Sequence, residues 1–239
     1  TVLYFHLITP PANTMEMYVV GKQWMWKLQH PEGKKEINEL HVPLGESVRL
    51  TMTSEDVLHS FYIPAFRVKK DVVPGRYTNL WFKATQVGSY HLFCAEFCGT
   101  AHALMKLRII AEPEEEFQKW VSIQQSGVMP QIPTEARERE LFEKGKELFI
   151  NGKFEGGQQC VFCHTIEDDE IRFKGTIGPN LTHVGSRKTL AAGIMDNTPE
   201  DLTKWLINPP EHKPGSIMPN LGLSPEQVSA LVVYLMALK

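Results

Sequence analysis

The chain has 239 residues, and its 25 basic and 28 acidic side chains leave a formal net charge of -3. Without a basic excess, a nucleic-acid-binding protein is not expected, and 42% hydrophobic with 22% charged residues excludes a chain that is disordered throughout. The sequence contains no apolar run of about 18 residues that would span a membrane by itself. Its four cysteines are too few for a disulfide scaffold, and its length suits two domains of roughly 100 residues each.

The first segment, Thr1–Ile8, is apolar and ends before Pro10-Pro11. It is too short to cross a bilayer, and no signal peptide is visible. We expect it to be either a frayed terminal strand or the end of a longer membrane-spanning segment.

Residues 12–110 are expected to form β structure. Apolar and polar side chains alternate over residues 47–53, and Trp24, Trp26 and Leu28 repeat the same period of two. Many short strands separated by turn sequences predict a sandwich or barrel. Further runs rich in aromatic and branched residues cover residues 79–84, 88–93 and 104–110.

Residues 111–135 are expected to link two domains. The segment begins with an acidic run that includes Glu114–Glu116, and Pro130 and Pro133 lie near its end. It has no clear period apart from one short helix expected around Phe117–Ile123.

Residues 136–239 are predicted to be helical. Leu141, Phe142, Leu148 and Phe149 recur at helical spacing. Two later helices are expected to begin after capping residues, which are Thr198 and Ser224.

The helical half contains the sequence Cys160-Val161-Phe162-Cys163-His164, a C-x-x-C-H pattern that indicates covalent haem attachment. Each thiol can add to a vinyl group at one edge of the haem, and the following imidazole can bind the iron. A redox dithiol would need a βαβ context that is missing here. Half of a zinc site would need a second cysteine pair at suitable spacing.

A methionine is expected as the second axial ligand, because a His/Met pair closes the iron site and suits electron transfer. Three candidates follow the haem motif: Met195, Met218 and Met236. Met236 falls within the last helix and Met195 just before a helix cap. Met218 is favoured, since prolines and a glycine hold its loop extended.

The β half contains a second ligand motif, C-x-E-x-C-x3-H-x2-M, between Cys94 and Met105. Its two thiols, one imidazole and one thioether form a soft donor set that suits copper. Two cysteines favour a binuclear centre over a mononuclear site, and His59 is the candidate for a second imidazole. A Cys94–Cys98 disulfide and a zinc site are the disfavoured alternatives. The other histidines are interpreted as surface residues: His6, His30, His41, His91, His183 and His212.

Residues 136–239 resemble a class I cytochrome c domain. The resemblance implies that the backbone carbonyl of Pro179 binds the His164 imidazole, that Gly145 meets Tyr234 where the first and last helices cross, and that Arg187 contacts a haem propionate. It rests on the haem motif, residues 178–181, Trp205, Asn208-Pro209, Met218-Pro219 and the terminal helix.

Residues 12–110 resemble the copper-A domain of cytochrome c oxidase subunit II. The resemblance rests on the Cys94–Met105 motif, Asp56–Phe61 with Ile63-Pro64, Val73–Arg76 and the aromatic stretch Gly21–Trp26. Lys22 stands where that family usually has His.

These two resemblances together imply a cupredoxin-like Greek-key β-sandwich followed by an all-α cytochrome c domain. Two coppers would be bound by His59, Cys94, Cys98, His102, Met105 and the backbone carbonyl of Glu96. The Glu96 side chain would reach a magnesium ion at the boundary with subunit I. Trp24 would be an electron entry point or would face the fused domain. Residues 1–11 would be the end of a transmembrane segment.

The implied function is that of subunit II of a haem-copper oxidase with a fused cytochrome c. Electrons from an external donor would pass through the haem and copper A to subunit I, where dioxygen is reduced to water and protons are pumped. The implied location is the outer side of a bacterial cytoplasmic membrane. Two alternatives remain: a copper-A component of a nitric oxide or nitrous oxide reductase, and a free soluble electron carrier.

Overall fold

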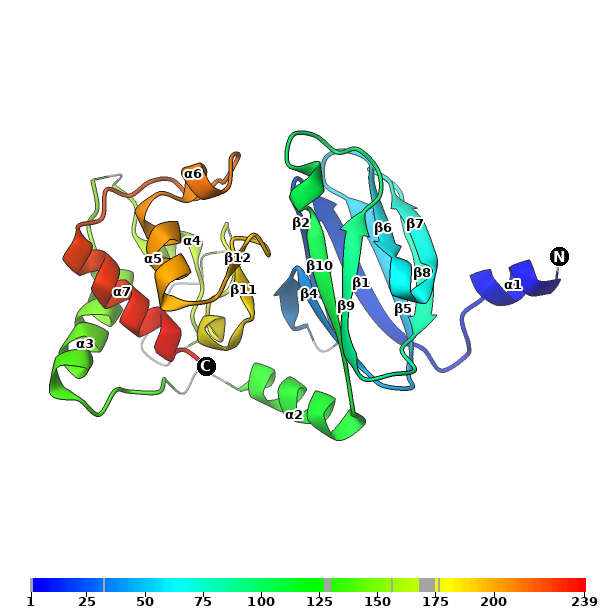
Figure 1. Ribbon diagram of the computed structural model, residues 1–239, viewed down its shortest axis with the longest axis horizontal. Coiled ribbons are helices and arrows are strands. Elements are labelled where there is room, and N and C mark those ends of the chain that lie inside the picture. Colours follow the sequence, from blue (N-terminus) through cyan, green and yellow to red (C-terminus); the bar gives the residue numbers. More distant parts are fainter. Residues whose placement is uncertain (1, 32, 127–129, 156, 168–174, 176) are drawn as a thin grey trace. The chain divides into compact units, whose positions relative to one another are not determined.

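The computed structural model describes residues 2–31, 33–126, 130–155, 157–167, 175 and 177–239. It contains two compact units, Thr1–Gln125 and Ser126–Lys239 (Figure 1). Residues 127–129 of the expected linker lie outside the described residues.

The first unit contains two five-stranded sheets, ordered β3-β2-β1-β5-β8 and β4-β10-β9-β6-β7. Most neighbouring strands are antiparallel, but β1 pairs with β5 and β4 with β10 in parallel. The expected strands are present, within a few residues of their predicted ends. The strands are β1 (Met15–Lys22), β2 (Met25–Gln29), β3 (Lys35–Ile37), β4 (Glu39–Pro43), β5 (Ser47–Ser54), β6 (His59–Ile63), β7 (Val68–Val72), β8 (Thr78–Lys83), β9 (Gly88–Cys94) and β10 (Lys106–Glu112).

Alternate residues of these strands form the core of the sandwich. On β5, Val48, Leu50 and Met52 are fully buried, which confirms the period of two expected for residues 47–53. Trp26 packs edge-on against Phe61 with ring centroids 5.0 Å apart. Burying a large apolar side chain stabilises the fold by about 1.5–3 kcal/mol, so this core holds the loops at the ends of the strands in place.

The N-terminal segment forms a helix, α1 (Val2–Ile8), and not a strand. Its side chains Tyr4, Phe5 and Leu7 are exposed. The Trp81 indole on β8 donates a hydrogen bond of 2.8 Å to the carbonyl of Leu7. In the part of the chain that the structure describes, no helix is long and apolar enough to cross a membrane.

Helix α2 (Glu114–Gln125) follows β10 directly and packs against β4. It is longer than the short helix expected at Phe117–Ile123 because the three glutamates of its first turn favour a helix N-terminus. Phe117 is buried. Much of the segment expected to be a linker is therefore part of the first unit.

The second unit is predominantly helical, with one short pair of two-residue strands. Thr198 and Ser224 cap the helices that follow them, and Ser224 forms a capping box with Gln227, as predicted. The elements are α3 (Ala136–Asn151), α4 (Cys160–Cys163), η3 (Val184–Ser186), β11 (Thr189–Leu190), β12 (Met195–Asp196), α5 (Pro199–Ile207), α6 (Pro209–His212) and α7 (Pro225–Ala237).

The first and last helices of this unit, α3 and α7, pack closely at Gly145. A β-carbon at Gly145 would lie 2.1 Å from the carbonyl oxygen of Ala230 and 2.7 Å from Cβ of Tyr234. The expected contact between Gly145 and Tyr234 is thus present, and only glycine allows it. Tyr234 is fully buried and packs against the rings of Phe142 and Phe149.

Candidate metal and haem sites

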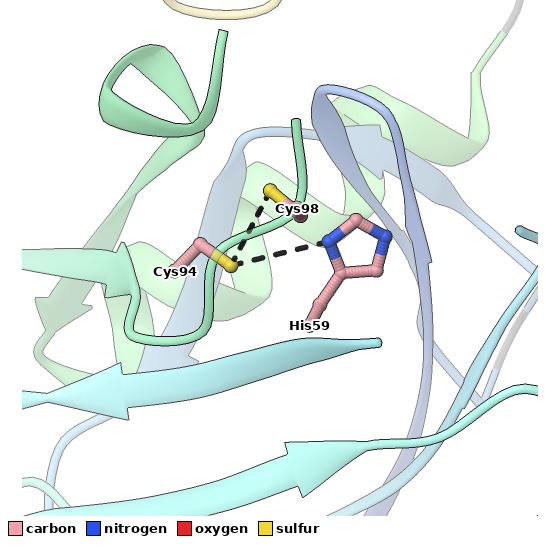
Figure 2. A group of neighbouring side chains, drawn as sticks. All are labelled: His59, Cys94 and Cys98. Carbon is pink, nitrogen blue, oxygen red and sulfur yellow. Dashed lines mark hydrogen bonds between the residues drawn. The ribbon is translucent and has the colours of Figure 1, made fainter. Parts of the chain in front are cut away.

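Three buried donors meet at one end of the sandwich: His59 at the start of β6, Cys94 at the end of β9, and Cys98 in the following loop (Figure 2). The Sγ atoms of Cys94 and Cys98 are 3.8 Å apart. Nδ1 of His59 is 3.9 Å from Cys94 Sγ. These atoms lie close enough together to share bound metal ions.

The remaining donors of the sequence motif surround the same two thiols. The Cys94 thiol lies 3.2 Å from the backbone carbonyl of Glu96. Cys98 Sγ lies 3.4 Å from Nδ1 of His102 and 3.7 Å from Sδ of Met105. The structure therefore brings all six predicted donors together, with an imidazole beside each thiol.

Backbone hydrogen bonds hold the loop that carries these donors. The Cys94 amide donates to the Met105 carbonyl at 3.1 Å, and the Ala95 amide donates to the Ser60 carbonyl at 2.9 Å. A short 3-10 helix, η2 (His102–Leu104), turns the chain back toward β10. The loop thus begins and ends on neighbouring strands of one sheet.

The two thiols differ in acidity. Burial raises the pKa of Cys94, but hydrogen bonds from His59 and the neighbouring backbone outweigh it and bring the pKa to about 7. Burial and the charge of Cys94 raise the pKa of Cys98 to about 12. Two adjacent buried thiols cannot both ionise without a compensating cation, so binding of metal by both thiolates would release a proton.

The donor set fits copper better than the alternatives. A disulfide requires an S–S separation of about 2 Å, whereas these sulfurs are 3.8 Å apart and both cysteines are free. Thiolate and thioether sulfur favour copper, and Met is not a usual zinc ligand. Two thiols flanked by two imidazoles provide donors for a pair of ions.

Asp56 is a site residue that sequence reasoning missed. Its Oδ1 accepts a hydrogen bond of 2.9 Å from Nε2 of His59. The proton on Nε2 leaves Nδ1, the atom that faces Cys94, free to bind a metal. Burial raises the pKa of Asp56, but hydrogen bonds from Gln23, His59 and Val57 outweigh it and lower the pKa overall. Its place in the Asp56–Phe61 segment, three residues before the predicted ligand His59, was the sequence signal.

Trp24 lies next to the same loop. It is partly buried against the core, and its indole Nε1 donates a hydrogen bond of 3.1 Å to the backbone carbonyl of Cys98. The predicted entry residue is therefore in direct contact with a predicted copper ligand.

The haem motif forms the single-turn helix α4, and the His164 that follows it has an extended backbone. Nδ1 of His164 makes a 2.8 Å hydrogen bond with the carbonyl of Pro179. That bond leaves Nε2 available to iron. Burial lowers the pKa of His164, which favours the neutral imidazole that a metal requires.

Two glycines allow the chain to close around this imidazole. A β-carbon at Gly178 would lie 2.4 Å from Cε1 of His164, and one at Gly175 would lie 2.3 Å from the carbonyl carbon of Cys163. Cys160 and Cys163 are free thiols, and burial raises the pKa of Cys160 to about 12. Free thiols beside a fixed neutral imidazole fit covalent attachment of haem.

Met218 and Arg187 are the other two residues predicted to contact the haem. Met218 is half-buried against the core of the second unit. Arg187 donates a hydrogen bond to the carbonyl of Asn180. Their roles at the iron and at a propionate remain predictions.

Two of the histidines interpreted as surface residues are buried, His30 and His183. Nε2 of His30 makes a 2.5 Å contact with Glu36, and His183 makes a 3.2 Å hydrogen bond with the Ser126 carbonyl. The interpretation was wrong because burial here depends on partners distant in the sequence.

Two family models match this sequence, one in each half of the chain. Residues 34–112 match the family model described as the periplasmic domain of cytochrome c oxidase subunit II, and residues 142–239 match the cytochrome c family model. The chain therefore combines a subunit II domain of cupredoxin-like fold with a helical cytochrome c domain. Both parts of the predicted fold class are confirmed.

Two individual relatives are named cytochrome c oxidase subunit 2. The chain is 34% identical over 230 residues to cytochrome c oxidase subunit 2 of Alkalihalophilus pseudofirmus, and the match covers 95% of this chain and 62% of the relative. It is 33% identical over 237 residues to the same subunit of Bacillus sp. strain PS3, covering 95% of this chain and 63% of the relative.

A solved structure also matches. It is the periplasmic domain of cytochrome oxidase subunit II of Bradyrhizobium japonicum, which is 32% identical with a TM-score of 0.47, and the match covers 49% of this chain and 97% of that structure.

Proposed function

We propose that this chain is the electron-transfer subunit II of a haem-copper terminal oxidase. It would relay electrons from an external donor through haem c and binuclear copper A to subunit I, where dioxygen is reduced to water with proton pumping. The observation that carries the proposal is the gathering of four further donors around the paired thiols of Cys94 and Cys98.

The residues of the first unit would hold two copper ions. Cys94 and Cys98 would hold them through their thiolates, and His59 and His102 would each contribute Nδ1, the atom that lies nearest a thiol. Met105 and the Glu96 carbonyl complete the donor set. Asp56 holds the His59 ring through Nε2 and so orients its ligand atom.

The residues of the second unit would hold one haem. Cys160 and Cys163 would bind it covalently, and His164 and Met218 would hold its iron. Pro179 fixes the His164 ring, and Arg187 would contact a propionate. When bound, the haem and the copper pair each supply a centre that gains and loses one electron, while the surrounding protein excludes substrate and water.

The same proposal assigns the chain a partner and a location. Subunit I would be the acceptor, and the Glu96 side chain would contribute to a magnesium site at the boundary with it. The exposed apolar helix α1 supports a position beside a membrane, because Tyr4, Phe5 and Leu7 are more than half exposed at 61%, 56% and 63%. The domains would lie on its outer side, and Trp24 would receive electrons at the copper site.

Metal loading of the full chain tests the proposal. The chain, matured with haem and supplied with copper, is expected to contain two coppers and one covalent haem. Metal analysis, electron paramagnetic resonance and a denaturing gel stained for haem measure these. The native complex should consume dioxygen and should not reduce nitrogen oxides. A chain that binds one copper or none, or a complex active only on nitrogen oxides, would contradict the proposal.

A further inference from the structure

The hairpin between β1 and β2 lies against the predicted copper ligands from a distant part of the sequence. Gln23, in the turn of this hairpin, makes hydrogen bonds to both sides of the site. Its backbone amide donates to Oδ2 of Asp56 at 2.7 Å, and its side-chain Nε2 donates to the carbonyl of Cys98 at 2.7 Å. Asp56 in turn accepts from His59 at 2.9 Å.

These bonds form one chain of contacts from one ligand to the other. His59 and Cys98 come from segments 39 residues apart, and no ligand lies on the hairpin itself. The contacts run from the His59 ring through the Asp56 carboxylate and Gln23 to the Cys98 backbone. They join protein groups directly and therefore preorganise the two ligands.

Two glycines make this close packing possible. A β-carbon at Gly99 would lie 2.9 Å from Nε2 of Gln23, and Gly99 has a φ of 113°, which side chains rarely adopt. A β-carbon at Gly21 would lie 2.9 Å from Cδ2 of His59. The hairpin thus contacts the His59 ring on one side and the Cys98 loop on the other.

From this geometry we infer that Gln23 is a positioning residue of the copper centre. It sets the placement of the His59 and Cys98 ligands and directs an N–H dipole toward the Cys98 backbone. This inference rests on the copper site of the proposed function. Because the positive end of the dipole points to the site, it stabilises the reduced, more electron-rich state. Loss of the donor should therefore lower the reduction potential.

The test uses the full copper-loaded chain and compares Gln23→Met, which keeps the side-chain length but removes the donor, with wild type. We expect two bound coppers, a lower reduction potential, and copper release to an excess of chelator that is about 2- to 10-fold faster, the effect of one hydrogen bond. Gln23→Lys retains an N–H donor of similar reach and should restore slow release. Gln29→Met, on the exposed end of β2, is the matched control and should match wild type.

A double-mutant cycle with Asp56→Asn separates this role from a general effect on folding. Because Asp56 holds the Gln23 backbone that places the Gln23 side chain, their effects on copper release should be less than additive. The inference is overturned if Gln23→Met lowers only the melting temperature and leaves the potential and release rate unchanged, if Gln23→Lys behaves as Gln23→Met, or if the two effects add. A wild-type chain that binds fewer than two coppers contradicts the proposed function itself.

Discussion

The imidazole of His41 stacks on the indole of Trp120, with ring centroids 4.2 Å apart and an angle of 10° between the planes. His41 lies on β4 and Trp120 on α2, so this contact fastens the helix to the sandwich. Nδ1 of His41 also makes a 2.8 Å hydrogen bond with Glu112, the last residue of β10. The cluster continues through Glu36 to the buried His30.

This cluster predicts a pH-dependent stability of the first unit. Burial lowers the pKa of His41, but the hydrogen bond to Glu112 and the charges of Glu36, Glu112 and Glu39 outweigh it and raise the pKa above 6.5. A raised folded-state pKa contributes stability that is fully present below about 6.5 and is lost as pH rises through the folded value. The free energy of unfolding of wild type should therefore fall over this range.

Urea unfolding at a series of pH values measures this effect. His41→Gln should be less stable than wild type at low pH, and the difference should shrink as pH rises. His91→Gln, at an exposed position on β9, is the control and should follow wild type. A difference between His41→Gln and wild type that stays constant with pH would show that His41 contributes by packing alone.

Replacing Cys98 should destroy the copper pair. One thiolate cannot replace the two that would hold both ions symmetrically, and Cys98 is the donor nearest to His102 and Met105. In Cys98→Ser, metal analysis should give fewer than two coppers per chain and a changed absorption spectrum. Cys160→Ser, in the haem motif, should leave the copper count at two. An unchanged copper count in Cys98→Ser would contradict the assignment of these residues as a copper site.

Replacing Met218 should open the iron site. Met218→Ala should keep the covalent haem, lower its reduction potential and allow carbon monoxide to bind, because the thioether favours reduced iron. Absorption spectra under carbon monoxide and a redox titration measure both effects. Met195→Ala and Met236→Ala should bind no carbon monoxide. If Met195→Ala opens the iron site instead, the ligand assignment is wrong.

The position of a truncation should decide whether the first unit stays stable. A chain ending at Gln125 keeps α2 and should retain the copper centre. A chain ending at Ile110 loses the Glu112 partner of His41 and the buried Phe117, which is 2% exposed. Loss of one such side chain costs about 1.5–3 kcal/mol. Thermal unfolding should show a lower midpoint for the shorter chain, and equal midpoints would contradict a structural role of α2.

The chain ending at Gln125 also tests the role of the haem. In the full complex, a subunit II ending at Gln125 should still pass electrons from copper to subunit I but should accept them poorly from the natural donor. A tether keeps two sites at an effective concentration of about millimolar, and the truncation removes that advantage. Steady-state oxidase activity with the natural donor measures the loss. Undiminished turnover would place electron entry at the copper domain, near Trp24.

The amino-acid sequence alone was enough to predict the two ligand motifs, the β and helical halves of the chain, and the helix caps at Thr198 and Ser224. These features are local, because donors within twelve residues, from Cys94 to Met105, or within one turn, as in Cys160–His164, are held together by chain connectivity. Periodicity and capping likewise depend on neighbours only a few residues away.

The distant residues that support those motifs became visible in the three-dimensional arrangement of the strands and helices. Asp56 and Gln23 reach the proposed copper ligands because the pairing of β1 with β5 brings their segments side by side. His30, interpreted from the sequence as a surface residue, is buried with Glu36 beside Trp120 of α2. The sequence around a single polar residue does not predict such contacts. Burial of the whole core fixes the sheet register and the docking of the helices, and these determine whether a polar side chain faces water or a partner.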